Sequence, residues 1–206
     1  MKTKLTSLLI EIVQNNILHG KWLNTLSYLE NCGARKIAAC EHPTLVKEEM
    51  LKHASEEFRH SHYLKKQIKR VSSSRFPNYR ASSILGGMNT LQYLNKLDLL
   101  TSRYLIKECS LNKDEVKKVA YLLVTYAIEL RAQEFYPIYE QVLREYRSKV
   151  YVKSIILEEE EHLREMQEGI ANLPLGLKYA ENVCSFEHFL FNKWMNGVEA
   201  DLFSPE

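Results

Sequence analysis

The motif Glu-x-x-His occurs twice in this chain, with Glu57 and His60 in the first copy and Glu159 and His162 in the second. Residues three apart on an α-helix lie on one face, about one turn from each other. Each copy can therefore present a carboxylate and an imidazole to the same metal ion. The recurrence predicts two helices that contribute to a shared metal site.

The scarcity of helix-breaking residues supports a helical fold. The 206 residues include only 7 Gly and 5 Pro, whereas an all-β protein needs a turn about every ten residues. Apolar periodicity predicts helices over residues 4–18, 22–40, 44–71, 91–109, 115–147, 149–171 and 177–197. We expect an all-α protein with a single domain over residues 1–206.

Local signals mark the ends of these helices. They are the His19-Gly20 pair after the first helix, the His42-Pro43 pair after the second, Thr44 as the N-cap of the third, the Asn112-x-x-Glu115 capping box, and Pro137 as a disturbance inside the fifth. Proline restricts the residue before it and interrupts a helix interior, and short polar residues cap helix starts. Residues 71–87, rich in serine, are expected to form the longest loop.

Two metal ions need one further carboxylate each, from two other helices. Glu30 precedes the first motif by 27 residues and Glu129 precedes the second by 30, which suits two antiparallel helices that meet at the same height. Glu134 is the competing residue. We prefer Glu129 because its neighbours Val124 and Ile128 are apolar, as expected in a buried seam.

These six residues resemble the ligand set of the ferritin-like di-iron carboxylate superfamily, which takes a Glu from each of two helices and Glu-x-x-His from each of two others. The resemblance covers about residues 22–171. It implies a ferritin-like antiparallel four-helix bundle, with accessory helices at about 4–18, 91–109 and 177–197. It also implies that Glu30, Glu57, His60, Glu129, Glu159 and His162 bind two iron ions, or a manganese–iron pair, which react with dioxygen or peroxide.

Three neighbours of the proposed ligands are further candidates. His53 lies on the same helix face as Glu57 and His60. It is a candidate for one of three roles: a hydrogen-bonding neighbour of a ligand, an extra ligand, or a core residue. Tyr28 and Tyr126 are candidate catalytic residues, because a tyrosine near an oxidising centre can hydrogen-bond a ligand or relay an electron. Their alternative role is packing with a satisfied hydroxyl group.

The resemblance leaves several functions open, because one fold hosts many chemistries. The first is an oxidase or oxygenase that uses dioxygen and an electron donor on a small-molecule substrate, or on tRNA, as in the tRNA hydroxylases of the superfamily. A ferroxidase, an iron-handling protein and a rubrerythrin-like peroxidase are alternatives. A helical interaction module without metal is the alternative from another class.

Composition limits the partners and the location. A net charge of +2 is too small to demand a nucleic-acid partner, although six cations fall between Lys65 and Arg80. The four cysteines form no Cys-x-x-Cys pair, which argues against a rubredoxin-type or zinc site and suits free thiols in the cytoplasm. Neither a signal peptide nor a membrane span is expected. The assembly is left open, a homodimer being compatible with the sequence.

Overall fold

A computed structural model describes residues 2–42 and 44–203, which are helical throughout apart from the connecting loops. The helices within these residues are α1 (Lys2–Gln14), α2 (Asn16–Cys40), α3 (Glu48–Val71), α4 (Gly87–Lys107), α5 (Lys113–Glu145), α6 (Lys153–Ala171) and α7 (Gly176–Phe203), with a short 3-10 helix, η1, at Ala81–Ser83. The all-α prediction is confirmed, and every predicted helix has a counterpart.

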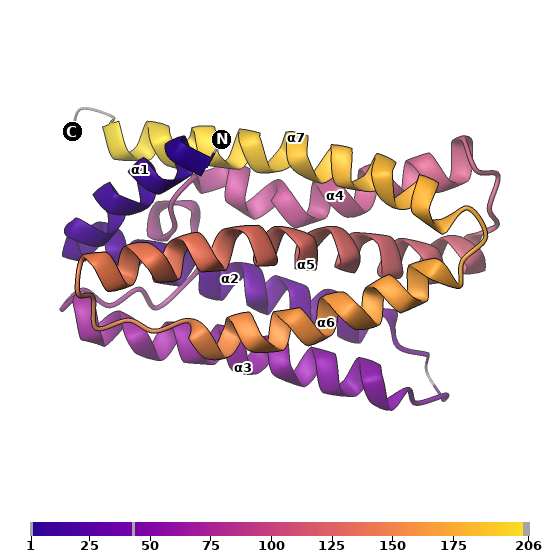
Figure 1. The fold of residues 1–206 in the computed structure, drawn as a ribbon, viewed down its shortest axis with the longest axis horizontal. Helices are drawn as coiled ribbons and strands as arrows, with labels where there is room; N and C mark the ends of the chain where they lie inside the picture. The colour runs from indigo at the N-terminus through magenta and orange to yellow at the C-terminus, as the bar shows by residue number, and fades with distance from the viewer. Residues whose placement is uncertain (1, 43, 204–206) are drawn as a thin grey trace.

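The helices α2 to α7 pack in antiparallel pairs along one common direction, and α1 runs obliquely to them (Figure 1). The pair α2–α3 makes the most extensive contact, and α5–α6 and α4–α7 follow. The helix α5 also packs against α4 and α7, and α1 lies across α2 and α5. As a result, the two helices that carry Glu-x-x-His, α3 and α6, lie side by side, with α2 and α5 next to them (Figure 1).

Two predicted local features are confirmed. The capping box before α5 is formed, because the Asn112 amide donates to the Glu115 carboxylate at 2.9 Å and the Glu115 amide donates to the Asn112 side chain at 3.1 Å. The long loop lies between α3 and α4. The side chain of Asn24 in α2 donates to the carbonyl groups of Asn78 and Ser83 and so fixes this loop.

The predicted break at His19-Gly20 is wrong. The break lies at Asn15, whose side chain accepts hydrogen bonds from the amides of Ile17 and Leu18 and caps α2. His19 and Gly20 lie buried inside α2. Gly20 is there because a Cβ atom would lie 2.9 Å from Ser72 and Phe76, so the loop after α3 approaches this helix closely.

Three other predicted boundaries differ from the structure. Thr44 is not an N-cap, since α3 begins at Glu48 and the Thr44 amide donates to His42 Nδ1 at 3.2 Å. Pro137 does not interrupt α5, and it lies on the exposed side of that helix. The helix α2 ends at Cys40 as expected, although Pro43 of the predicted boundary lies outside the described residues.

The core is an apolar cluster to which all seven of these helices contribute, with Trp22, Tyr139 and Phe191 among its largest fully buried side chains. Trp22 of α2 stacks on Trp194 of α7, with ring centroids 5.8 Å apart. Among the described residues, no helix combines the length and apolarity that a membrane crossing requires.

Candidate metal centre

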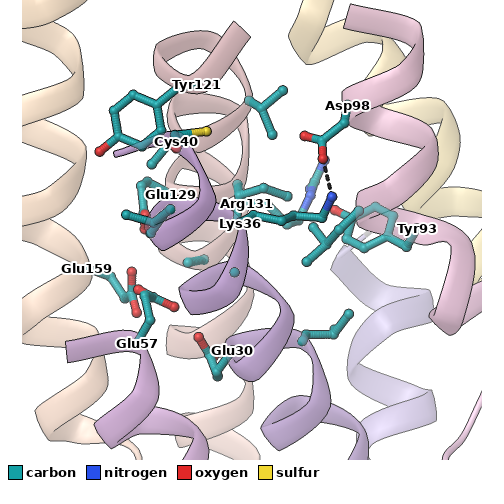
Figure 2. Close-up of a pocket in the computed structure, with 18 of the residues that line it drawn as sticks. Glu30, Lys36, Cys40, Glu57, Tyr93, Asp98, Tyr121, Glu129, Arg131 and Glu159 are labelled. Carbon is teal, nitrogen blue, oxygen red and sulfur yellow. Dashed lines mark hydrogen bonds and ion pairs between the residues drawn. The ribbon is translucent and has the colours of Figure 1, made fainter. Parts of the chain in front are cut away.

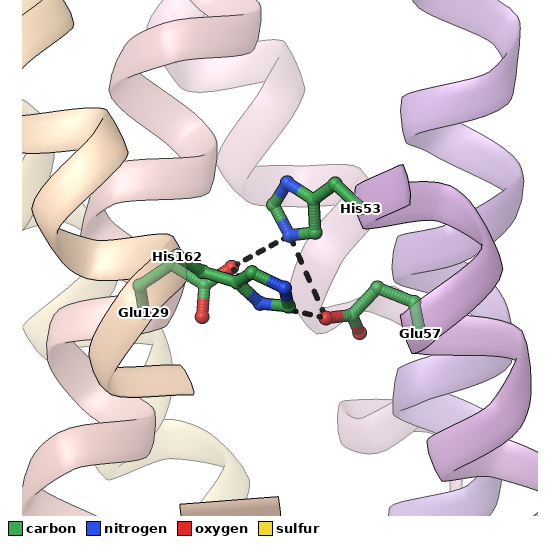
Figure 3. A group of neighbouring side chains, drawn as sticks. All are labelled: His53, Glu57, Glu129 and His162. Atoms are coloured by element: carbon green, nitrogen blue, oxygen red, sulfur yellow. Dashed lines mark hydrogen bonds and ion pairs between the residues drawn. The ribbon is translucent and has the colours of Figure 1, made fainter. Parts of the chain in front are cut away.

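Seven side chains form two overlapping groups in the interior between α2, α3, α5 and α6. The first group is His53, Glu57, Glu129 and His162, and the second is Glu30, Glu57, His60 and Glu159. Within each group one donor atom per residue lies within 4.8 Å of the others. Figure 3 shows the first group, with both imidazoles and the Glu57 carboxylate turned toward one another. These two buried groups could hold metal ions.

Two carboxylates join the groups. Glu57 belongs to both, and its Oε1 lies 3.6 Å from His53 Nε2 and from His162 Nδ1. One oxygen of Glu159 lies 3.1 Å from His60 Nδ1, and the other lies 3.4 Å from His162 Nδ1. Each oxygen of Glu159 therefore faces a different histidine, as in a carboxylate that bridges two ions.

The outer nitrogen of each motif histidine contacts a further glutamate. His60 Nε2 lies 2.7 Å from the Glu158 carboxylate, which also accepts two hydrogen bonds from Arg59. His162 Nε2 lies 2.8 Å from the Glu56 carboxylate. Such contacts fix the ring orientation and the tautomer of a metal-binding histidine and leave Nδ1 directed at the site.

Burial shapes the charge of the carboxylates. Burial, followed by the negative charges of Glu57 and Glu159, raises the pKa of Glu30 well above its ordinary value. Burial and the charge of Glu159 do the same to the pKa of Glu129. Both groups therefore favour the neutral form unless a cation lies beside them. The Tyr136 hydroxyl group donates a hydrogen bond to Glu30 and holds that carboxylate in place.

The donor set fits a pair of divalent cations. Among the described residues, several buried donor atoms of the two groups make no well-aligned hydrogen bond; they are His53 Nδ1, His60 Nδ1, Glu129 Oε2 and Glu159 Oε1. His60 Nδ1 and Glu159 Oε1 lie 3.1 Å apart as an ion pair. A buried polar atom without a partner costs about 1–3 kcal/mol, and coordination of a cation would satisfy the three on His60, Glu129 and Glu159. Carboxylate oxygens and imidazole nitrogens suit iron or manganese.

The structure brings all six predicted ligands together. It also separates Glu129 from its competitor, since Glu129 is 2% exposed and within the first group, whereas the side chain of Glu134 is 51% exposed and paired with Arg131. His53 contacts Glu129 through Nε2 at 3.1 Å, so it is more than a packing residue.

The two tyrosines predicted as catalytic lie elsewhere. The Tyr28 hydroxyl group donates to the Leu91 carbonyl group at 3.2 Å and its ring packs on Tyr79. Tyr126 lies near Cys184 of α7. Neither phenol lines the cavity beside the glutamates, so the geometry gives their predicted catalytic role no support. Tyr136, which donates to Glu30, is a tyrosine in contact with a candidate ligand.

Sequence reasoning missed Glu56 and Glu158, the two glutamates that contact the motif histidines. The signal was present, because both motifs read Glu-Glu-x-x-His. In each case the first glutamate reaches across to the histidine of the other helix, Glu56 to His162 and Glu158 to His60. These reciprocal contacts depend on how α3 packs against α6, which cannot be predicted from the sequence alone.

A cavity of about 410 Å³ lies next to the glutamates, with most of its wall from α2, α4 and α5. Its apolar wall includes Leu26, Leu29, Leu94, Val124, Ile128 and Phe135, and the candidate ligands Glu30, Glu57, Glu129 and Glu159 also border it. Figure 2 shows these glutamates on one side and the paired Lys36 and Asp98 on the other. Gly33 in the wall leaves space near Glu57 Oε2, 3.5 Å from where a Cβ atom would lie.

The other charges on the wall are largely paired. Arg131 donates two hydrogen bonds to the buried carboxylate of Glu187 in α7, at 2.9 and 2.6 Å, and Tyr93 of α4 donates to the same carboxylate. This network joins α4, α5 and α7 behind the cavity and neutralises the guanidinium group.

Comparison with known proteins gives no match. No family model, no curated protein and no solved structure is significantly similar to the chain. What the structure establishes is an all-helical protein with antiparallel packing and two buried His/Glu groups that could hold metal ions.

Proposed function

We propose that this chain is a ferritin-like dimetal carboxylate enzyme that oxidises a small-molecule substrate with dioxygen. The observation that carries the proposal is the apolar cavity whose wall includes four glutamates of the two overlapping groups. A volume of about 410 Å³ falls within the range of small-molecule sites. A centre that only oxidised and stored iron would have no need of such a cavity.

The residues have distinct roles in this proposal. Glu30, Glu57, His60 and Glu159 would hold one ion, and Glu57, Glu129, His162 and His53 the other, with Glu159 also facing His162. When bound, two iron ions or a manganese–iron pair would supply the redox chemistry that activates dioxygen.

The surrounding residues would orient the ligands and exclude water. Glu56 and Glu158 hold the imidazole rings. Tyr136 donates a hydrogen bond to Glu30 and fixes the orientation of that carboxylate. The buried helix faces exclude bulk water from the site, which strengthens electrostatic interactions there.

The alternative functions differ in testable ways. A ferroxidase would oxidise many equivalents of Fe(II) without a substrate, a peroxidase would consume peroxide with an electron donor, and an interaction module would bind no metal at all. A tRNA substrate is less well supported than a small molecule, because part of the basic run does not face solvent. Lys65 of the basic run points inward to Asn24 and the Phe76 carbonyl group.

Single-turnover dioxygen consumption tests the proposal. Iron-loaded wild-type protein should consume dioxygen once per dimetal site. Glu57→Ala should lose both ions and His162→Ala should lose the ion of its own group, and neither variant should consume dioxygen. The control is Glu160→Ala, an exposed residue of the same helix turn, which should behave as wild type. Iron binding and dioxygen consumption that survive in both site variants would refute the proposal.

A further inference from the structure

We infer that the cavity beside the glutamates binds an anionic amphiphile, such as an aliphatic carboxylate, with its apolar body toward the glutamates and its head group beside Lys36 and Lys117. The inference names a substrate class and so rests on the proposed function. Its evidence is the lining of the cavity, which has the glutamates on one side, the Lys36–Asp98 pair on the other (Figure 2), and apolar side chains in much of the remaining wall.

The apolar part of the cavity wall favours an apolar body. Leu29 of α2, Leu94 of α4, and Val124 and Ile128 of α5 are among its lining residues. Each methylene group that leaves water for such a wall strengthens binding about fourfold. A sugar or another polar molecule would lose hydrogen bonds to water here without replacement.

The positive charge available to a ligand lies at the solvent side. Arg131 is held by the buried Glu187. Lys36 is partly exposed and pairs with Asp98, which is 39% exposed. Lys117 is exposed, lines the cavity, and has no ion-pair partner among the residues that the structure describes. An anionic head group would meet Lys117 directly and could compete with Asp98 for Lys36.

In the metal-free protein, the carboxylates of the inner end disfavour the reverse orientation. Glu30, Glu57, Glu129 and Glu159 border that end, and their charge would repel an anion wherever bound cations leave it uncompensated. A cationic head group would be attracted to these glutamates in the metal-free protein, and Lys117 would repel it. In the iron-loaded protein a carboxylate would also be attracted to the bound cations, so the Lys117→Met variant, and not the sign of the head group alone, reports on the inferred orientation.

Calorimetric titration of the iron-loaded protein with three probes tests the inference. Decanoate, decanol and decyltrimethylammonium share one apolar chain and differ in the charge of the head group. We expect decanoate to bind about tenfold more tightly than decanol, a difference typical of a charge-assisted hydrogen bond. We expect no measurable binding of decyltrimethylammonium.

Matched variants separate the head-group site from the apolar wall. Lys117→Met should weaken decanoate binding about fivefold, whereas Lys118→Met, an exposed neighbour outside the cavity wall, should not change it. Asp98→Asn should strengthen binding by about threefold, because it frees Lys36. A merely structural role of Asp98 would not increase affinity.

Two variants fill the cavity, so that a folding failure in one does not end the test. Ala132→Phe and Ile128→Phe each place a larger side chain in the wall and should abolish decanoate binding with the helical circular dichroism retained. Equal binding of the three probes, preference for the cation, or unchanged decanoate binding in Lys117→Met and Asp98→Asn would overturn the inference.

Iron analysis of the same samples distinguishes this inference from the proposed function. Protein that holds two iron ions but binds no decanoate refutes the substrate class and leaves the metal centre standing. Protein that holds no iron refutes the proposed function, whatever the amphiphile does.

Discussion

At the scale of single residues, the reciprocal glutamate–histidine contacts between α3 and α6 have the clearest consequence for metal binding. Glu56 contacts His162 and Glu158 contacts His60, so each helix orients the histidine of the other. A histidine that is free to rotate binds a metal ion more weakly than one held in place, because ring freedom is lost on binding.

We predict that Glu56→Gln and Glu158→Gln each reduce metal affinity by about tenfold or more, the usual effect of losing a carboxylate that orients a ligand histidine. Competition with a chelating dye measures the change. Glu160→Gln, on the exposed face of α6, is the matched control and should leave affinity as in wild type. Equal affinity in all three variants would show that the two carboxylates do not orient the rings.

A second residue-scale prediction concerns His19, which is 1% exposed and contacts the Tyr139 hydroxyl group at 2.8 Å. Burial lowers the pKa of His19 to about 4, from about 6.5 in an unfolded chain. Between these values the unfolded state binds the proton and the folded state does not. The free energy of unfolding should therefore fall as the pH falls from about 6.5 to 4, by at most about 3 kcal/mol from this residue.

His19→Gln can keep a hydrogen bond to Tyr139 and removes this titration. Urea unfolding at neutral pH and near pH 4.5 should then show a smaller loss of stability on acidification than wild type. His188→Gln, on the exposed face of α7, is the control. A loss as large in His19→Gln as in wild type would contradict the assignment.

At the scale of elements, most helices follow from apolar periodicity, but their ends depend on contacts between helices. The break before α2 was predicted at His19-Gly20 because glycine is rare in helix interiors. Gly20 lies inside α2 because the loop at Ser72 and Phe76 leaves no room for a side chain. That contact joins residues about fifty positions apart, and no local pattern reports it.

The start of α2 gives a prediction at this scale. The Asn15 side chain accepts hydrogen bonds from the amides of Ile17 and Leu18 at 3.0 and 3.1 Å. Asn15→Ala should lower the free energy of unfolding by about 1 kcal/mol, measured by urea unfolding. Asn16→Ala, one residue further and exposed, should change it by less than about 0.5 kcal/mol. Equal effects would mean that Asn15 does not cap the helix.

At the scale of the whole molecule, the sequence predicted the candidate ligands better than their surroundings. The six candidate ligands could be predicted from their spacing in the sequence. A motif on one helix and a glutamate on the preceding helix meet when the two antiparallel helices have similar lengths. The cavity does not follow in this way. Its wall combines Leu94 of α4 and Trp194 of α7 with residues of α2 and α5, and only the packing of the complete chain brings them together.

The placement of tyrosines shows the same limit. Tyr28, Tyr126 and Tyr136 all lie within two helical turns of a predicted ligand. Only the rotation of each helix decides which ring reaches the site, and Tyr136 is the one that contacts Glu30. The distance in sequence from a predicted ligand therefore limits which tyrosines can reach the site, but it does not identify the one that does.

The number of metal ions per chain tests the central claim most directly. Anaerobic titration of the purified protein with Fe(II), followed by elemental analysis, should give two ions per wild-type chain. Glu57 belongs to both groups whereas Glu30 belongs to one; Glu57→Ala should therefore lose both ions, and Glu30→Ala should retain one. A wild-type chain that binds no iron, or a Glu57→Ala variant that still binds two ions, would contradict the dimetal centre.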